Sequence, residues 1–321
     1  MRIVMMGTGP FAVPTFEALN DDPQHEVVAV ITRPDRAGKG RRQVVNPMRV
    51  SSEQRNVPVY DPPDVNDPAA CQLLAGLAAE LFVVCDYGQI LSREVLQLAT
   101  LGGINLHGSL LPKYRGAAPV QWAVINGDRE SGVTVIHMTP KLDAGPCIAV
   151  DRIDVDPDET AGELEERLSR IGVDTVGRAV ELLTGWDGDS VLGDIQDTSD
   201  ATKAPRLKKA DGELNWELSA AALANRVRGL QPWPGAFTFA PRPKGDPLRL
   251  LIVKAQAAPA APNQGPPGSV VRADDALWIS TGEGVLALEA VQPAGKRRLT
   301  CQEFLRGYPL ECGTQLGRPK E

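Results

Sequence analysis

The sequence is organised around one stretch, Gly102-Gly-Ile-Asn105-Leu106-His107-Gly-Ser-Leu-Leu-Pro112. It predicts a short apolar strand that passes through Gly108 into a tight loop. Alternate side chains of a strand face the same side, so Asn105 and His107 should lie together while Leu106 points into the core. An amide donor and an imidazole at the carboxyl end of a strand are suited to polarising a carbonyl group.

Strands and helices alternate on both sides of this stretch. A strand over 2–6, a helix over 14–19 and a strand over 25–32 have the spacing of a right-handed parallel βαβ unit. The alternation predicts the α/β class, with a Rossmann-like, doubly wound and mostly parallel sheet. Further strands are expected over 57–60, 81–85, 103–107, 133–138 and 147–155, and helices over 68–79, 92–99, 117–127 and 159–183, the last with a break near Gly172.

The character of the chain changes after about Asp187. We expect a first domain over 1–190, a polar and irregular linker over 191–207, and a second domain over 208–321. One helix and several short strands in the second domain predict a small β-barrel. The helix is expected over 219–229, the strands over 236–240, 248–255, 268–271, 277–280 and 285–290, and an exposed Ala/Pro-rich loop over 255–267.

Length and composition argue against several classes of protein. A chain of 321 residues is long enough for about two domains. Its five cysteines lack CxxC spacing and it has three histidines, which disfavours a disulfide framework and a zinc site. No apolar run approaches the roughly 18 residues of a membrane span, and the first residues do not resemble a signal peptide. We therefore expect a cytoplasmic protein with reduced thiols, no metal site and no membrane segment.

The net charge of −7 argues against bulk electrostatic binding of nucleic acid. The charge is unevenly distributed along the chain. Residues 207–321 contain 15 Lys and Arg against 11 Asp and Glu, whereas residues 1–206 contain 19 against 30. A basic second domain fits a local site for a polyanion, although an imbalance of this size also arises by chance.

Two loops follow expected strands, which is where open α/β sheets bind ligands. Gly7-Thr-Gly-Pro-Phe-Ala12 matches a dinucleotide fingerprint, but the second strand ends in Ile31-Thr-Arg-Pro34 without the acidic residue that would bind a ribose. A tight turn, or a helix N-terminus beside the active cleft, is therefore favoured over NAD(P) binding. Tyr87-Gly-Gln-Ile90 follows the strand over 81–85 and should lie over the same crevice.

A basic loop follows the second strand. Between Arg33 and Arg42 the sequence has five basic residues, one acidic residue and two glycines. Such a segment cannot bury itself, and its composition suits it to hold phosphate groups and to order on contact. A merely solvated loop is the alternative. The side chains expected to bind phosphate are Arg36, Lys39, Arg41 and Arg42, with Lys208, Lys209 and Lys296–Arg298 as candidates for more distant phosphates.

An acidic partner for Asn105 and His107 is expected downstream. Asp143 lies in a loop between two strand-like runs, two residues before Gly145. By default such an aspartate is a turn former, and a lone histidine in an apolar strand is a core residue. Asn105, His107 and Asp143 are thus ordinary one by one, and they form a site only if the fold brings them together.

Two motifs carry a resemblance to a known family. Asn105-x-His-x-Ser-Leu-Leu-Pro112, followed by Tyr114-Arg-Gly-Ala-Ala-Pro119, is similar to the signature of the folate-dependent formyltransferases. Within that family, the chain resembles the members that formylate initiator methionyl-tRNA. The resemblance runs from Met1 to about Gly317, and the further segments that carry it are Met5–Thr8, Phe11–Pro14, the loop over 33–42, and Leu230–Ala236.

The resemblance implies a formyltransferase fold followed by an OB-like, tRNA-binding β-barrel. It implies a transferase that moves the formyl group of 10-formyltetrahydrofolate, a co-substrate, to the α-amino group of methionyl-initiator tRNA for translation initiation. Nothing in the sequence demands more than a monomer, and we expect one. Asn105 would donate a hydrogen bond to the oxyanion, and His107 as an imidazolium would be a second donor. Asp143 would orient His107 and accept the amine proton, and no metal is implied.

The resemblance also implies where the substrates bind. The loop over 33–42 would meet the acceptor end of the tRNA. Two positions depart from the family pattern, because Asp86 stands where relatives often have a small apolar residue and Pro10 stands where they commonly have Asp. The folate pocket would be formed by Tyr87, Gly88, Gln89, Ile90, Ser109, Leu110, Leu111 and Pro112.

Two alternatives remain open. A formyltransferase for a small amine, such as a ribonucleotide or an amino sugar, would share the chemistry of residues 1–206. It would need neither the basic loop over 33–42 nor the C-terminal domain. A non-catalytic nucleotide- or RNA-binding protein on a Rossmann-like scaffold is the second alternative, and the combination of Asn105, His107 and Asp143 argues against it.

Overall fold

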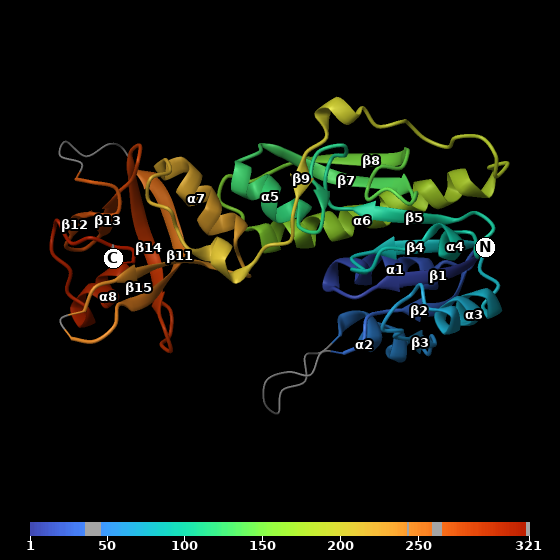
Figure 1. Cartoon of the computed structure of the whole chain (residues 1–321), viewed down its shortest axis with the longest axis horizontal. Coiled ribbons are helices and arrows are strands. Elements are labelled where there is room, and N and C mark those ends of the chain that lie inside the picture. The colour runs from blue at the N-terminus through green and yellow to red at the C-terminus, as the bar shows by residue number, and fades with distance from the viewer. Residues whose placement is uncertain (36–45, 243, 259–264, 319–321) are drawn as a thin grey trace. The chain divides into compact units, whose positions relative to one another are not determined.

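The computed structural model describes residues 1–35, 46–242, 244–258 and 265–318. The chain divides into two compact units, each of which is built from more than one segment (Figure 1). The first consists of Met1–Pro119, Glu130–Asp154 and Leu164–Pro205, and the second of Val120–Arg129, Val155–Glu163 and Arg206–Glu321. Domain boundaries at 190 and 207 stay a prediction. Within the described residues, every helix is too short or too polar to span a lipid bilayer.

A seven-stranded sheet forms the centre of the first unit, in the order β3-β2-β1-β4-β5-β7-β8. The strands from β3 to β5 are parallel, whereas β7 is antiparallel to β5 and β8 is antiparallel to β7. The predicted mostly parallel sheet is therefore confirmed. Its strands are β1 (Arg2–Gly7), β2 (Glu26–Ile31), β3 (Val59–Tyr60), β4 (Leu81–Cys85), β5 (Gly103–His107), β7 (Glu130–His137) and β8 (Cys147–Asp154).

Helices bury both faces of this sheet. One face packs in a core with residues of α3 (Pro68–Gly76) and α4 (Arg93–Leu96). Phe16 of α1 (Val13–Asp21) is fully buried but does not belong to that core. The long helix α6 (Ala161–Thr184) runs along β5, β7 and β8, as Figure 1 shows. The expected break of this helix near Gly172 is wrong. A Cβ at Gly172 would lie 2.5 Å from Leu106 Cδ2, so the glycine permits close packing of an unbroken helix on β5.

Two helices were not expected from the sequence pattern. In α2 (Pro47–Gln54), the Asn46 side chain accepts a hydrogen bond from the Arg49 amide and Pro47 occupies the first turn, both of which favour helix initiation. In α8 (Cys301–Gly307), Thr300 and Glu303 form a reciprocal capping box. Both helices are short, so their apolar periodicity is weak and their caps are the stronger signal.

The second unit contains an antiparallel sheet in the order β10-β11-β14-β13-β12, with β15 paired to β14. The expected C-terminal domain of several short strands is therefore confirmed, and these strands pair as an antiparallel sheet. The expected loop from Ala255 is wrong for its first residues, because β11 continues to Ala258 opposite Val285. Residues 259–264 lie outside the described part of the chain. The strands are β10 (Ala236–Ala240), β11 (Leu248–Ala258), β12 (Val270–Ala273), β13 (Leu277–Ser280), β14 (Val285–Pro293) and β15 (Leu299–Thr300).

Helix α7 (Ala220–Gly229) packs on β11 and also covers segments from earlier in the chain. A Cβ at Gly229 would lie 2.5 Å from Ile125 Cγ1 of α5 (Pro119–Asn126), so the two helices approach closely. Arg228 donates hydrogen bonds to the Glu159 carbonyl at 2.8 Å and to Asn225 Oδ1 at 2.8 Å. The second unit thus includes most of α5 and the segment over 155–163.

Candidate active site

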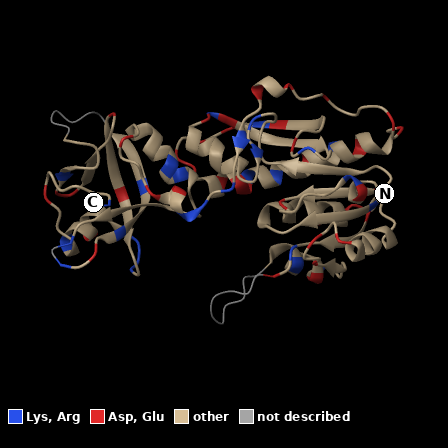
Figure 2. Cartoon of the chain, viewed as in Figure 1, with Lys and Arg blue, Asp and Glu red and all other residues tan. Residues whose placement is uncertain are grey.

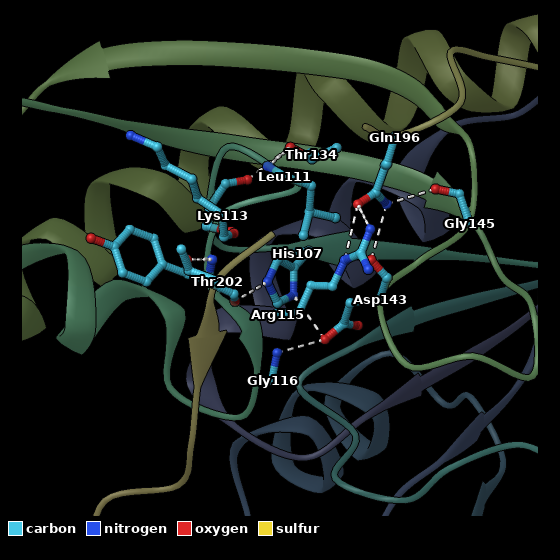
Figure 3. Close-up of polar contacts among 12 residues, drawn as sticks. His107, Leu111, Lys113, Arg115, Gly116, Thr134, Asp143, Gly145, Gln196 and Thr202 are labelled. Carbon is cyan, nitrogen blue, oxygen red and sulfur yellow. Dashed lines mark hydrogen bonds and ion pairs between the residues drawn. The ribbon is translucent and has the colours of Figure 1, made fainter. Parts of the chain in front are cut away.

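His107 lies at the carboxyl end of β5 with only 5% of its surface exposed. Its Nε2 lies 2.9 Å from the Tyr114 carbonyl oxygen, which can only accept a hydrogen bond, and this assigns the ring hydrogen to Nε2 (Figure 3). The other ring nitrogen, Nδ1, faces Asp143 Oδ2 at 3.9 Å. A proton taken up at Nδ1 would therefore sit beside a carboxylate.

Asp143 reaches this position from the loop between β7 and β8. Its carboxylate oxygen Oδ2 accepts a hydrogen bond from the Gly116 amide at 2.8 Å. Its backbone has a φ of +48°, in the left-handed region that costs a residue with a Cβ free energy. The fold thus brings His107 and Asp143 together although 36 positions separate them, which the sequence alone could not show.

Asn105 lies on the same face of β5 as His107, as their spacing predicts. It is paired with Val84 of β4 and Ile136 of β7, so it occupies the middle of the sheet near the carboxyl ends of the strands. The side chain is half-buried, and none of the described residues forms a hydrogen bond with it. Its amide N–H groups are therefore available to a ligand.

The loop after His107 is fixed by hydrogen bonds to its own backbone and to β7. The Thr134 hydroxyl donates to the Ser109 carbonyl at 2.7 Å and accepts from the Leu111 amide at 3.2 Å. The Ser109 hydroxyl donates to the Lys113 carbonyl at 2.7 Å. Ser109 is fully buried, so its contribution here is to shape the loop that carries Leu110, Leu111 and Pro112.

Gln196 belongs to the site, although nothing in the sequence pattern pointed to it. Its Nε2 donates to the carbonyl oxygens of Asp143 at 2.9 Å and Gly145 at 2.7 Å. Its Oε1 accepts from Arg115 Nε at 3.1 Å and Nη2 at 2.6 Å. Figure 3 shows this amide between the two loops that carry the site. The segment expected as a linker thus makes ordered contacts.

A few residues further on, the same segment supports the loop over 108–118. Strand β9 (Lys203–Ala204) pairs in parallel with β6 (Arg115–Gly116). The Thr202 hydroxyl accepts a hydrogen bond from the Tyr114 amide at 2.8 Å. Because the Tyr114 carbonyl in turn accepts from His107, this short pairing helps to set the orientation of the imidazole.

The expected folate loop, Tyr87–Ile90, follows β4 at the point where the strand order reverses between β1 and β4. The Tyr87 ring is buried, its burial raises the pKa of the hydroxyl, and among the described residues that hydroxyl has no hydrogen-bond partner. The Gln89 side chain accepts from the Val65 amide and donates to the Pro62 carbonyl. Ile90 is 64% exposed and offers an apolar surface to a ligand.

Two carboxyl groups, those of Asp86 and Glu165, lie close to each other next to the loop over Tyr87–Ile90. Asp86 packs against Gly9, where a Cβ would come within 1.9 Å of Asp86 Oδ2, so the second glycine of the Gly7-x-Gly9 turn makes room for this side chain. Glu165 of α6 is largely buried, and this burial, followed by the nearby charge of Asp86, raises the pKa of Glu165 to about 7. Nothing in the sequence pattern indicated this pair.

The basic residues expected to bind phosphate are only partly described. Arg36, Lys39, Arg41 and Arg42 lie outside the described residues. Figure 2 shows Lys and Arg on α7 and on the segment leading to it, interspersed with Asp and Glu. Arg297 pairs with Glu303 at 2.8 Å, whereas Lys296 and Arg298 form no ion pair with a described residue. Over the described ranges, no group of three or more His, Cys, Asp and Glu side chains could hold a metal ion.

Comparison with solved structures identifies the fold. An N-formyltransferase from Helicobacter canadensis in complex with folinic acid and dTDP-3-aminofucose superimposes with a TM-score of 0.63 at 17% identity. The comparison covers 89% of this chain and 98% of that one. HypX from Aquifex aeolicus in complex with tetrahydrofolic acid gives a TM-score of 0.59 at 17% identity, over 95% of this chain and 47% of HypX. At these identities the likeness concerns the fold alone.

Sequence comparison is more specific. Residues 1–180 match the formyl transferase family and residues 206–309 match the formyl transferase C-terminal domain. A methionyl-tRNA formyltransferase from Rhodopirellula baltica is 45% identical over 327 residues, which cover 99% of this chain and 97% of that protein. The methionyl-tRNA formyltransferase of Solibacter usitatus is 41% identical over 322 residues, with 99% of both chains covered. The chain therefore belongs to the methionyl-tRNA formyltransferase family.

Proposed function

We propose that this chain transfers the formyl group of 10-formyltetrahydrofolate to the α-amino group of methionyl-initiator tRNA, producing formylmethionyl-tRNA for translation initiation. The observation that carries the proposal is the meeting of His107 and Asp143 beside the half-buried amide of Asn105. The two methionyl-tRNA formyltransferases that align with 99% of this chain, at 41–45% identity, support the choice of substrate. We expect the chain to act as a cytoplasmic monomer.

The geometry suits attack of an amine on a formyl carbon. An α-amino group titrates near pH 8 and esterification lowers that value further, so the neutral nucleophile is available at physiological pH. Attack forms the new C–N bond and places negative charge on the formyl oxygen. Asn105 Nδ2 donates a hydrogen bond to this oxygen, and protonated His107 donates a second one from Nδ1. Donors of this kind stabilise the transition state by about 2.7–4 kcal/mol each.

Asp143 has two roles in this scheme. Its carboxylate, 3.9 Å from His107 Nδ1, stabilises the imidazolium charge. It also accepts the proton of the attacking amine, through a water molecule, after the tetrahedral intermediate forms. The oxyanion then re-forms the formyl carbonyl as the bond between the formyl carbon and N10 of the folate breaks, and Asp143 returns the proton to N10 through the same water molecule. Every proton transfer is thus assigned to a residue of this chain or to water.

The substrates would be held by the loops around this centre. We assign the folate to the crevice formed by Tyr87–Ile90 and Ser109–Pro112, with exposed Ile90 and Leu142 as apolar contacts. Leu142 is 57% exposed and directly precedes Asp143. The acceptor end of the tRNA would meet the basic loop, through Arg36, Lys39, Arg41 and Arg42.

The experiment that tests the proposal measures formyl transfer from 10-formyltetrahydrofolate to several acceptors. Charged initiator methionyl-tRNA is compared with glycinamide ribonucleotide and an amino sugar nucleotide. We expect transfer to the tRNA alone. Transfer only to a small amine would agree with the assignment of the catalytic site but contradict the assignment of tRNA as the substrate. Absence of transfer to any acceptor would overturn the proposal.

His107 and His137 provide a matched test of the catalytic assignment. Both lie at strand ends, and in each the Nε2 atom contacts a carbonyl oxygen, that of Tyr114 or of Leu101. His137 also packs edge-on against Trp186, outside the site. We expect His107→Gln to lower kcat by about 10²–10³-fold with unchanged tRNA affinity. His137→Gln should retain kcat within about threefold. Equal losses in the two variants would show that His107 acts through stability alone.

A further inference from the structure

Gln196 has all of its hydrogen-bonding capacity used by the two loops of the site. Both amide hydrogens go to carbonyl oxygens of the Asp143 loop, and the amide oxygen accepts two bonds from Arg115. The residue has 9% of its surface exposed, so these bonds are shielded from water. A buried side-chain amide that hydrogen-bonds to four atoms fixes the relative positions of these atoms more firmly than a solvent-exposed amide does.

The two carbonyl oxygens belong to a part of the backbone that needs support. Asp143 has the left-handed φ of +48°, which costs a residue with a Cβ about 1 kcal/mol or more. Gly145 lies against the end of β7, where a Cβ would come 1.7 Å from the His137 carbonyl oxygen. Gln196 binds the carbonyls on both sides of Ala144 and thereby holds Asp143 in this conformation.

Arg115 connects the same amide to the other loop. The residue after it, Gly116, donates its amide N–H to Asp143 Oδ2, and the residue before it, Tyr114, accepts from His107 Nε2. A displacement of Arg115 would therefore be transmitted to both members of the His107–Asp143 pair. The Gln196–Arg115 contact joins the backbone of Asp143 to the segment that positions its carboxylate.

We propose that Gln196 is a positioning residue for formyl transfer, which sets the distance between His107 Nδ1 and Asp143 Oδ2 by tying Arg115 to the carbonyls of Asp143 and Gly145. The proposal rests on the proposed function and adds a residue to it. Gln196 does not touch the reacting atoms. Its loss should lower kcat and leave the binding of both substrates almost unchanged.

The variant Gln196→Glu separates the two halves of this contact. A carboxylate of the same shape still accepts from Arg115, but it presents an oxygen instead of an NH₂ group to two carbonyl oxygens. We expect kcat to fall by about 10- to 100-fold, the effect of a displacement of roughly 1 Å, with both KM values within about twofold of the parent chain. Gln196→Asn, whose amide is too short to reach all partners, is the second variant if the first does not fold.

Gln231 offers a matched control in the second unit. Its Nε2 also donates to two carbonyl oxygens, those of Val227 and Val253, both at 2.9 Å. Gln231→Glu removes the same kind of contact far from His107 in sequence and should lower thermal stability without lowering kcat. A kcat loss of equal size in the two variants would overturn a specific role of Gln196.

An independent readout comes from the histidine rings, because the chain contains only three histidines. In ¹⁵N-histidine-labelled protein, Gln196→Glu should shift the ring ¹⁵N resonances of His107 and leave those of His25 and His137 in place. A kcat within twofold of the parent chain, or unshifted His107 resonances, would each overturn the proposal. An inactive parent chain would instead contradict the proposed function, and the NMR comparison would still test the role of Gln196.

Discussion

At the scale of single residues, the largely buried carboxyl group of Glu165 has the clearest consequence for stability. Its pKa is raised to about 7, first by burial and second by the charge of Asp86. A carboxyl that binds its proton more tightly in the folded state stabilises the fold at low pH. That contribution is fully present below the unfolded pKa near 4.5 and is lost as pH rises through about 7.

Replacement of Glu165 by Gln should remove this pH dependence. The difference between the folded and unfolded pKa corresponds to a loss of about 3 kcal/mol between pH 4.5 and pH 8. We therefore expect Glu165→Gln to be more stable than the parent chain by an amount that grows by about this value over that range. Urea unfolding at pH 5, 6, 7 and 8 would measure it.

The adjacent Glu166 supplies the control. It is exposed and pairs with Arg170 at 2.6 Å on the surface of α6. An exposed pair of this kind contributes little, so the stability of Glu166→Gln should follow that of the parent chain at every pH. Parallel pH curves for Glu165→Gln and the parent chain would show that the pKa of Glu165 is the same in the folded and unfolded states.

The sequence could predict part of the site at this scale. Asn105 and His107 share a face because a strand repeats every two residues, and this local rule needs no knowledge of the fold. Gln196 could not be found in this way. Its partners Arg115 and Asp143 are 81 and 53 positions away, and the surrounding segment is polar and irregular. Its role depends on how loops meet, which no local pattern encodes.

At the scale of elements, α6 packs directly on β5, the strand that carries the proposed site residues Asn105 and His107. Gly172 faces Leu106, whose neighbours in the strand are Asn105 and His107. Apolar periodicity predicted the helix correctly, but a glycine in the middle of it was mistaken for a break. The reason for this glycine is a close approach to another element, which lies outside the helix sequence. The caps of α2 and α8, by contrast, were local signals that could have been recognised.

Two glycines of α6 should respond to substitution in opposite ways. Gly177 is exposed, and a Cβ at this position would have nothing within 4 Å, so Gly177→Ala should stabilise the protein by about 0.5–1 kcal/mol through helix propensity. Gly172→Ala gains the same propensity but forces the new methyl group against Leu106, at a cost of about 1–3 kcal/mol. We expect a net loss of about 1 kcal/mol, measured by urea unfolding.

The functional readout of this pair is the rate of formyl transfer. A shift of Leu106 moves β5 and with it Asn105 and His107, the two side chains of this strand that we assign to formyl transfer. Gly172→Ala should therefore lower kcat, whereas Gly177→Ala should leave it unchanged. A stabilised Gly172→Ala protein with full activity would mean that Leu106 moves aside without effect on the strand.

At the scale of the whole molecule, the two compact units do not follow each other simply along the chain. The second unit takes up residues 120–129 and 155–163 from within the sequence of the first. The change of composition after Asp187 comes before the C-terminal strands, the first of which begins at Ala236, but it carries no information about these two segments. Their membership of the second unit follows from contacts with α7, for example from Arg228 to the Glu159 carbonyl.

A fragment that ends at Pro205 should consequently be less stable than the full chain. It retains the seven-stranded sheet but removes α7, against which Ile125 and Glu159 pack. Helix α5 buries Val120, Ala123, Val124 and Ile125, and loss of cover would expose part of this apolar surface. We expect the fragment to have a lower Tm than the full chain and to bind the dye ANS. Arg228→Ala in the full chain, which removes the hydrogen bonds of this side chain to the carbonyls of Asp156 and Glu159 and to Asn225 Oδ1, should lower Tm by a smaller amount. A fragment with the Tm of the full chain and no dye binding would show that the catalytic unit folds without the C-terminal residues, and that α5 needs no partner from them.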